Sequence, residues 1–492
     1  MTSDGRVVFG KRRSRVWVVV IVLVILAIVG TLAGVAAAAI LLTESGRTPR
    51  EWAVYLRSQN VGGSATAAKF VDQVADYLNR VDGIGPADGL TIPQSHGASA
   101  ARSGDTRIGH VRLVRTVDAL RDAVASSLPN DIILLAPGTY RVTGGAVQFA
   151  TIGNRDGRLT LRAATLGDVV IESDVVEAFN VSGPFWQFEN LVMRGVCGDH
   201  GKCEHAIHIS GAATDTTIRN SRFEDFNAHL KINGDRGEWP DNGVIEGNTL
   251  VNTAPRRTQN PIVPIDLVGA SEWRVSGNVI ADFAREGRGQ PTYGAYFKGA
   301  GQKNVFERNV VLCAWKLKDS GGARVGVSLG GGGTDPAQRR DRGALGMEQV
   351  GSVIRDNLIA FCSDAGIYLN RAARSTIAHN TLLDTAGIDG RFIETSGDVV
   401  ANIVDGAIRT REGATLRGWD NDHPYLLGLF FGHHPQQAYF RDLVKLDLGW
   451  VRAPDKLAPD PNDTGTDLCG EKRGPLTRAG AFDDYAACLK RQ

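Results

Sequence analysis

The 492-residue sequence lacks an excess of either charge. It has 55 Lys and Arg against 54 Asp and Glu, a formal net charge of +1. A protein that coats nucleic acid normally carries a basic excess, so this class is disfavoured and no nucleic-acid partner is expected. Methionine (3 residues) and phenylalanine (17) are scarce beside 59 glycines, which favours many turns over long helices. The glycines follow no three-residue period, and this excludes collagen.

Long hydrophobic runs are also lacking, with one exception at the N-terminus. No charge occurs from Val16 to Leu42, a run longer than the roughly 20 residues that cross a bilayer as a helix. Lys11, Arg12, Arg13 and Arg15 precede it. The positive-inside rule predicts a cytoplasmic tail (1–15), a single-pass signal anchor in the plasma (inner) membrane (16–43) and a periplasmic or extracellular remainder. The alternatives are a signal cleaved near the alanine run and a buried core helix.

Cysteine is sparse as well, with six residues. Outside the cytoplasm, cysteines that flank a short segment are plausible disulfide partners. Two disulfides are predicted: Cys197–Cys203 and Cys469–Cys488. Cys313 and Cys362 lie in apolar runs (VVLCAW and IAFCSD) and are predicted to be free, buried thiols. A zinc site is disfavoured because the close, repeated spacing of zinc ligands is absent.

What the sequence does have is a repeat. An apolar residue, an asparagine and a second apolar run recur in phrases such as IRNSRF, VSGNVI and IRDNLI. The spacings of the asparagines are 30, 28, 30, 31, 48, 23 and 22 residues. The repeated residues are Asn190, Asn220, Asn248, Asn278, Asn309, Asn357, Asn380 and Asn402. A period of this length, with two or three short strands per unit, is typical of a β-solenoid.

We therefore predict an all-β fold, a right-handed parallel β-helix. Stacked asparagines can hydrogen-bond to their copies as a ladder, and inward Ile, Val and Leu form one continuous core. The spacing of 48 indicates a loop inserted in one coil, of the kind that decorates a binding face. The predicted order is a juxtamembrane helical region with a linker (44–105), the β-helix with a short capping helix (106–415) and a C-terminal capping region (416–492).

The asparagine coils, the opening DIILLAPGTY and the closing DLCGEKRGPLTRAGAFDD resemble pectate lyase-like and chondroitinase B-like parallel β-helix proteins, in a membrane-anchored form. The resemblance covers roughly residues 110–485. It implies a polysaccharide lyase with an acidic polysaccharide as substrate. It also raises Ca²⁺ as a cofactor, although no acidic run lies beside a lysine here. No cofactor is otherwise indicated, and the metal is left open.

Strand alternation predicts which side chains point outward from one sheet. In HLKIN, for example, Leu230 and Ile232 point inward, so the residues beside them point outward. The predicted outer row, in coil order, is His208 and Ser210; His229, Lys231 and Asn233; Asp266; Tyr296 and Lys298; Ser328; Tyr368 and Asn370. Such a row of cations, one acid and aromatic rings suits an acidic glycan that lies along a groove.

β-Elimination needs a base, a cation that neutralises the substrate carboxylate, and a proton donor. Lys231 or His229 is the expected base, and Lys298 or a neighbouring Arg is the expected neutraliser. Tyr296 is the expected proton donor, and Asp266 is the acid between the lysines. Predicted substrate-binding residues are His208, Asn233, Trp239, Tyr368, Asn370 and Arg371. Two other functions stay open: a non-catalytic glycan-binding or scaffold component that works with polysaccharide biosynthesis or export proteins, and an epimerase or hydrolase that uses the same face.

Overall fold

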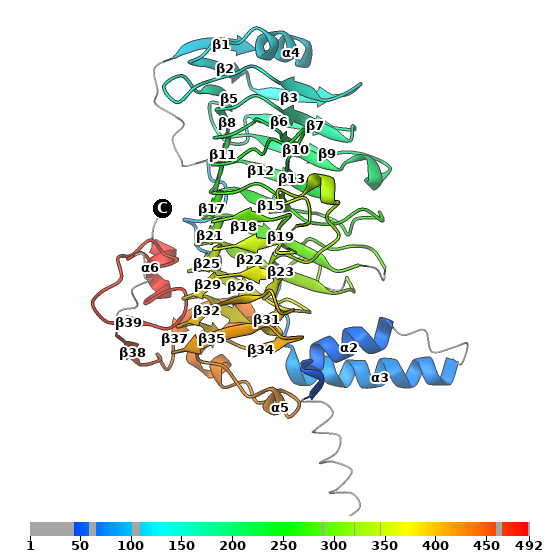
Figure 1. The fold of residues 1–492 in the computed structure, drawn as a ribbon, viewed down its shortest axis with the longest axis vertical. Coiled ribbons are helices and arrows are strands. Elements are labelled where there is room, and N and C mark those ends of the chain that lie inside the picture. Colours follow the sequence, from blue (N-terminus) through cyan, green and yellow to red (C-terminus); the bar gives the residue numbers. More distant parts are fainter. Residues whose placement is uncertain are drawn as a thin grey trace, which may run out of the picture. The chain divides into compact units, whose positions relative to one another are not determined.

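Three long parallel sheets form the body of the structure, a computed structural model (Figure 1). It describes residues 44–58, 65–100, 109–287, 290–318, 320–344, 346–458 and 465–490. The predicted tail (1–15) and signal anchor (16–43) lie outside these residues. Within the described part, no helix is both long enough and apolar enough to cross a membrane.

Most coils contribute one strand to each of three sheets, here named A, B and C. Sheet A consists of β1 (His110–Val114), β2 (Asp131–Leu135), β5 (Leu159–Ala163), β8 (Trp186–Glu189), β11 (Thr217–Arg219), β14 (Val244–Glu246), β17 (Arg274–Ser276), β21 (Val305–Glu307), β25 (Val353–Arg355), β29 (Ser375–Ala378), β32 (Ser396–Val400) and β35 (Thr415–Trp419). Sheet B consists of β3 (Gly138–Val142), β6 (Val169–Ser173), β9 (Val192–Gly195), β12 (Arg222–Glu224), β15 (Thr249–Val251), β18 (Val279–Ala281), β22 (Val310–Leu312), β26 (Leu358–Ala360), β30 (Thr381–Leu383) and β33 (Ile403–Val404). Sheet C consists of β4 (Val147–Phe149), β7 (Glu177–Val181), β10 (His205–Ser210), β13 (Ala228–Asn233), β16 (Ile265–Val268), β19 (Thr292–Lys298), β23 (Arg324–Leu329), β27 (Ile367–Asn370), β31 (Gly387–Arg391) and β34 (Ala407–Arg411).

Strand pairing confirms the predicted parallel β-helix. In sheet C, β27 pairs in parallel with both β23 and β31, and the strands of all three sheets follow the order of the coils. This topology is consistent with the right-handed coil expected from the sequence. A short fourth sheet, β20 (Gly301–Gln302), β24 (Gln349–Val350) and β28 (Ala372–Ala373), follows the same order.

The predicted asparagine ladder is present. From Asn248 onward, each side-chain amide donates to the Oδ1 of the next asparagine, at 2.8–3.1 Å, through Asn278, Asn309, Asn357, Asn380 and Asn402 to Asn421. Asn220 donates to Asn190 in a separate pair at 2.7 Å. The amides also bind backbone carbonyl groups, so the ladder satisfies polar groups at one buried corner of each coil from Asn248 to Asn402.

Inward-facing apolar residues of the three sheets form one continuous core. Helix α4 (Val117–Ala125) packs Leu120 and Val124 into this core at its N-terminal end. The outer face of sheet B is covered by a second apolar cluster from the C-terminal region. That region holds α5 (Leu426–Leu429), β36 (Phe440–Asp442), β37 (Asp447–Trp450), β38 (Lys456–Leu457), β39 (Thr477–Arg478) and α6 (Tyr485–Lys490).

All six cysteines form disulfides. The predicted pairs Cys197–Cys203 and Cys469–Cys488 are confirmed. The prediction that Cys313 and Cys362 are free thiols is wrong, because they form a third disulfide. Each follows the ladder asparagine of its coil by four or five residues, Asn309 and Asn357, and these two coils are neighbours in the stack.

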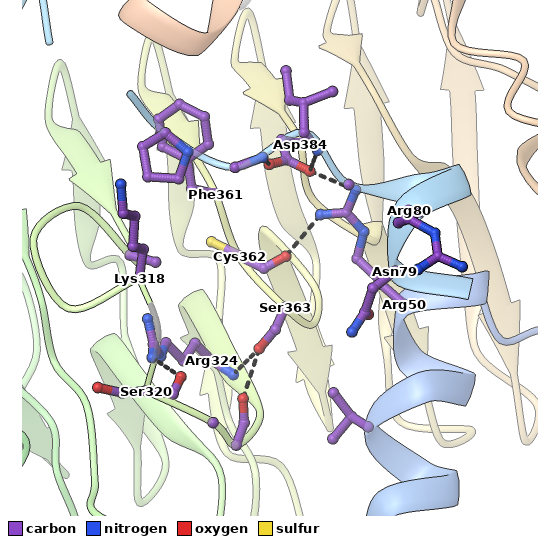
Figure 2. A pocket seen from close by; sticks show the side chains of 18 of the residues that line it. Arg50, Asn79, Arg80, Lys318, Ser320, Arg324, Phe361, Cys362, Ser363 and Asp384 are labelled. Atoms are coloured by element: carbon purple, nitrogen blue, oxygen red, sulfur yellow. Dashed lines mark hydrogen bonds and ion pairs between the residues drawn. The ribbon is translucent and has the colours of Figure 1, made fainter. Parts of the chain in front are cut away.

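The region predicted to be juxtamembrane (44–105) contains two packed helices, α2 (Pro49–Ser58) and α3 (Ala65–Asp82), beside the last coils (Figure 1). Buried Arg50 connects the two helices to the last coils. It pairs with Asp82 and, at 2.7 Å, with Asp384, and it donates to the Cys362 carbonyl at 3.0 Å (Figure 2). Glu51 adds a bidentate ion pair to Arg409 of β34.

A second attachment of α3 is expected to depend on pH. The Nδ1 of His434 lies 2.6 Å from Asp405 Oδ1, and its Nε2 lies 3.1 Å from the Val81 carbonyl oxygen. Burial opposes the charge, but the hydrogen bond and charge of Asp405, with Asp82, outweigh it and raise the pKa of His434 above 6.5. The charged pair therefore stabilises the fold fully below about pH 6.5, down to the acid range where Asp405 is protonated, and the contribution is lost as pH rises through the raised pKa.

Hydrogen exchange of α3, corrected for intrinsic rates, is the measurement. We expect protection to fall as pH rises above about 6.5. His434→Gln should remove this pH dependence and lower local stability by about 1.5–3 kcal/mol, the range for a charge-assisted hydrogen bond. Equal pH dependence in the variant would contradict the assignment.

Candidate functional site

The outer face of sheet C carries an unbroken row of polar side chains in register. Lys231 pairs with Asp266, Asp266 with Tyr296, Tyr296 with Ser328, and Ser328 with Tyr368. The row begins earlier than predicted, at Gln148 and Asn180 before His208, and continues to Asp389 and Arg409. The alternation of the strands places these side chains on one line along the solenoid.

A lysine–aspartate pair lies at the centre of the row. The Nζ of Lys231 is 2.5 Å from Asp266 Oδ2. Burial opposes the charge of Asp266, but Lys231 and Lys298 outweigh it and hold the pKa of Asp266 below its usual value. The ammonium of Lys231 is thus held by an ionised carboxylate. This arrangement suits a cation that binds an anion better than it suits a base.

Tyrosines continue the centre of the row. Tyr296 stacks on Tyr293 with ring centroids 4.6 Å apart, and Lys298 Nζ lies 4.5 Å from the centroid of Tyr296. Burial, with the charges of Tyr293 and Asp266, raises the pKa of Tyr296 well above its ordinary value. Its hydroxyl therefore stays protonated near neutral pH and can act as a proton donor.

The loop inserted after β23 (residues 330–348 apart from 345) forms one wall of the centre. Tyr296 donates to the Gly332 carbonyl at 3.3 Å. Arg340 from the same loop covers a face of Trp239, 4.8 Å from the ring centroid, and pairs with Asp241 at 2.5 Å. Asp266 is 6% exposed and Tyr296 is 7% exposed, so the insertion and the two lysines leave little of the centre open.

At the first coils, His208 joins two neighbouring strands. Its Nδ1 lies 2.6 Å from Glu177 Oε1, and its Nε2 lies 2.6 Å from Asn233 Oδ1. Burial would raise the pKa of Glu177, but the hydrogen bond and charge of His208 outweigh it and lower the pKa to about 2. Glu177 also lines a hollow of about 390 Å³ with Lys202 and Gly144.

His205 belongs to this cluster, although sequence reasoning did not select it. Its ring lies 5.4 Å from that of His208, and its Nδ1 is 3.3 Å from the Ala228 carbonyl oxygen. Burial, followed by the charges of His208 and Lys231, lowers the pKa of His205 to about 4. With Nδ1–H donated to the carbonyl, a neutral ring leaves Nε2 free to accept a proton.

Glu204, next to His205, was missed as well. Burial, with the charge of Glu177, raises the pKa of Glu204, although Lys231 acts in the opposite direction. Asn260 donates a hydrogen bond to its carboxyl group. Glu204 is thus a second titratable group at the Lys231 end of the row. Neither residue was found because both precede the strand AIHIS from which the sequence pattern was read.

His229 does not point outward as predicted. It is fully buried beside Phe226, and its Nε2 lies 3.1 Å from the Val251 carbonyl oxygen. Burial lowers the pKa of His229 to about 4. The regular register of β10 and β13 is interrupted at this residue. The alternation that assigns Lys231 to the outer face therefore does not extend back to His229. Its predicted role as base is therefore withdrawn.

The predicted substrate-binding residues of the last coils contact other residues of the protein. Asn370, nearly buried, donates to the Tyr368 hydroxyl at 2.8 Å. Arg371 lies 4.3 Å from the Phe392 ring centroid and 3.7 Å from Glu394 Oε2. Ion pairs join Arg409 and Arg411 to Asp389.

The described residues contain no group of three or more His, Cys, Asp or Glu side chains that could hold a metal ion. Asp266, the central carboxylate, is paired through Oδ2 with Lys231, and one carboxylate supplies too few of the roughly six to eight oxygen ligands that calcium takes. The residues of the row therefore do not fit a Ca²⁺ site, and no step is derived through one.

A larger hollow of about 600 Å³ lies elsewhere, between α2–α3 and the loops around Ser320 and Ser363 (Figure 2). None of the residues predicted to be catalytic or substrate-binding lines this hollow. Most of its cations are already committed: Arg57 pairs with Asp76, and Arg324 donates to three backbone carbonyl groups. Arg80, which also lines the hollow, forms no ion pair with a described residue. We therefore place the candidate site on sheet C.

No protein-family model and no curated protein sequence matches this chain. Among solved structures, the chain is similar to pectate lyase Pel9A, with 15% identity and a TM-score of 0.49 over 80% of this chain and 100% of that one. A rhamnogalacturonan lyase matches with 11% identity and a TM-score of 0.45 over 62% and 82%. An alginate lyase from Paenibacillus sp. str. FPU-7 matches with 12% identity and a TM-score of 0.35 over 64% and 95%. The fold assigned to this chain rests on its sheet register, and the activities named are those of the other proteins.

Proposed function

We propose that the outer face of sheet C binds an acidic polysaccharide and cleaves it by β-elimination, in a protein anchored in the plasma membrane with its solenoid outside the cytoplasm. The observation that supports the reaction most is the shared register of Lys231, Asp266 and Tyr296, with His205 beside them. The three disulfides favour an oxidising compartment.

The residues divide the reaction among them. Lys231 and Lys298 neutralise the uronate carboxylate, which acidifies the neighbouring C–H group. His205 Nε2 removes that proton as a carbon–carbon double bond forms and the glycosidic C–O bond breaks. Tyr296 gives its proton to the leaving oxygen. Electrons and protons balance without a further reactant.

A panel of uronic-acid polymers tests this function. The full-length protein should raise the absorbance of the unsaturated product with at least one polymer. No increase with any polymer, together with measurable binding, would replace the lyase with a non-catalytic glycan-binding protein. The low exposure of Asp266 and Tyr296 is the observation that favours this second function.

The pH–rate profile tests His205 separately. Because its lowered pKa is about 4, kcat/KM should rise with pH through about 4 as the ring loses its proton. His205→Gln should lose activity by about a hundredfold or more and lose this acidic limb. An unchanged limb in the variant would assign the base to another group.

A further inference from the structure

Helix α3 carries two apolar stripes, and they differ in how far they are buried. At 3.6 residues per turn, Val71, Ala75 and Leu78 form one stripe. Ala75 is fully buried, and α3 packs against α2. The second stripe is Phe70, Val74, Tyr77 and Val81, about 100° around the helix.

The two aromatic residues of the second stripe face solvent, and Val74 and Val81 are half-buried. Phe70 is 65% exposed and Tyr77 is 53% exposed. The stripe ends at Val81, whose carbonyl oxygen accepts from His434, beside the turn that follows α5. That turn exposes Phe431 (77%), and Tyr425 precedes α5 with 86% exposure. Four exposed aromatic side chains on α3 and on the adjoining α5 segment are more than a surface that meets only water needs, so they indicate an interaction site.

Cations flank the stripe. Lys69 and Arg80 are 11 residues apart, three turns of helix, and therefore lie on the same side of α3. Both are exposed, and neither forms an ion pair with a described residue. The nearby acid Asp76 is bound by Arg57. Aromatic and apolar residues with flanking Lys and Arg are the pattern of a helix that lies in a membrane interface.

The chain before α2 indicates which surface covers the stripe. The uncharged run ends at Leu42, and α2 begins at Pro49. Seven residues span at most about 25 Å when fully extended. If 16–43 is the anchor proposed above, the bilayer surface is within reach of α2 and of α3, which packs on it.

We propose that α3 and the α5 turn dock on the bilayer surface. Phe70, Tyr77, Phe431 and Tyr425 enter the headgroup region, and Lys69 and Arg80 reach lipid phosphates. The inference rests on the membrane anchor of the proposed function, but not on the polysaccharide reaction. It assigns α3 a role as an interfacial helix that orients the last coils toward the membrane.

The test uses the full-length, oxidised protein in vesicles of phosphatidylcholine and phosphatidylglycerol. Single cysteines replace Phe70, Tyr77 or Phe431 and carry an environment-sensitive fluorophore. The native cysteines do not react because all six are disulfide-bonded. Leu113→Cys on β1, an exposed apolar site at the other end of the sheets, is the matched control. Nitroxide lipids should quench positions 70, 77 and 431 severalfold more than position 113.

Each other outcome overturns the proposal in a distinct way. A protein that floats with vesicles but shows no quenching at 70, 77 and 431 keeps its anchor and loses this docking surface. A blue shift of the fluorophore emission without quenching would show that a protein, such as a second copy of this chain, covers the surface in place of lipid. Failure to float removes the anchor as well. Lys69→Gln with Arg80→Gln should reduce quenching in the anionic vesicles, while free phosphate should not.

Discussion

Lys231→Met is expected to abolish most activity and to destabilise the protein. Lys231 supplies a cation to the substrate in the proposed reaction, so kcat/KM should fall about a hundredfold or more. The same change leaves Asp266, 6% exposed, without its partner. Breaking a largely buried ion pair costs several kcal/mol. Because Lys231 is partly exposed, we expect a loss of about 2–4 kcal/mol in the free energy of unfolding.

A double variant separates the two effects. Lys231→Met with Asp266→Leu removes both charges, and replacing a buried pair by apolar side chains is often neutral for stability. The double variant should recover most of the unfolding free energy and remain inactive. Denaturant unfolding and the polymer assay are the two measurements. A stable Lys231→Met protein with parental activity and glycan affinity would remove Lys231 from the site.

Asn309→Ala should destabilise the solenoid by about 3–5 kcal/mol. Asn309 is fully buried and donates to Asn357 Oδ1 and to the carbonyl oxygens of Val275 and Glu307, and its own oxygen accepts from Asn278. Its removal leaves several buried polar groups without partners, each costing about 1–3 kcal/mol.

The end of the ladder provides the control for this prediction. Asn421 is half-buried and is the last acceptor of the series. Asn421→Ala should therefore cost about 1 kcal/mol, because water can reach the groups it leaves. Chemical denaturation of both variants is the measurement. Equal losses would show that the ladder contributes no more inside the stack than at its end.

The fold and the centre of the row could be predicted because both follow from periodicity. The repeated asparagine identifies one corner of each coil, which sets the phase of the strands between. Within a strand, alternation then assigns the face, and it placed Lys231, Asp266 and Tyr296 correctly on adjacent coils. Parallel stacking converts sequence separations of 35 and 30 residues into neighbours without further information.

What periodicity could not supply is the behaviour at strand ends. His229 lies one step before the regular part of β13, where the register is interrupted and the side chain enters a buried corner. His205 is the first residue of β10 and Glu204 directly precedes it, so both also lie at a strand end. Their altered pKa values arise from burial, which the sequence pattern does not show. The ion pair that occupies Lys231 likewise depends on a side-chain distance, not on register alone.

The Cys313–Cys362 disulfide has a consequence for a cut chain. It joins two neighbouring coils across the whole segment that contains the insertion after β23. A protease that cleaves once within residues 330–344 therefore leaves both halves covalently linked, and they separate only after reduction. The insertion that forms the wall beside Tyr296 therefore lies inside a covalently closed loop. New chain ends can be made in that loop without separating the two parts of the protein.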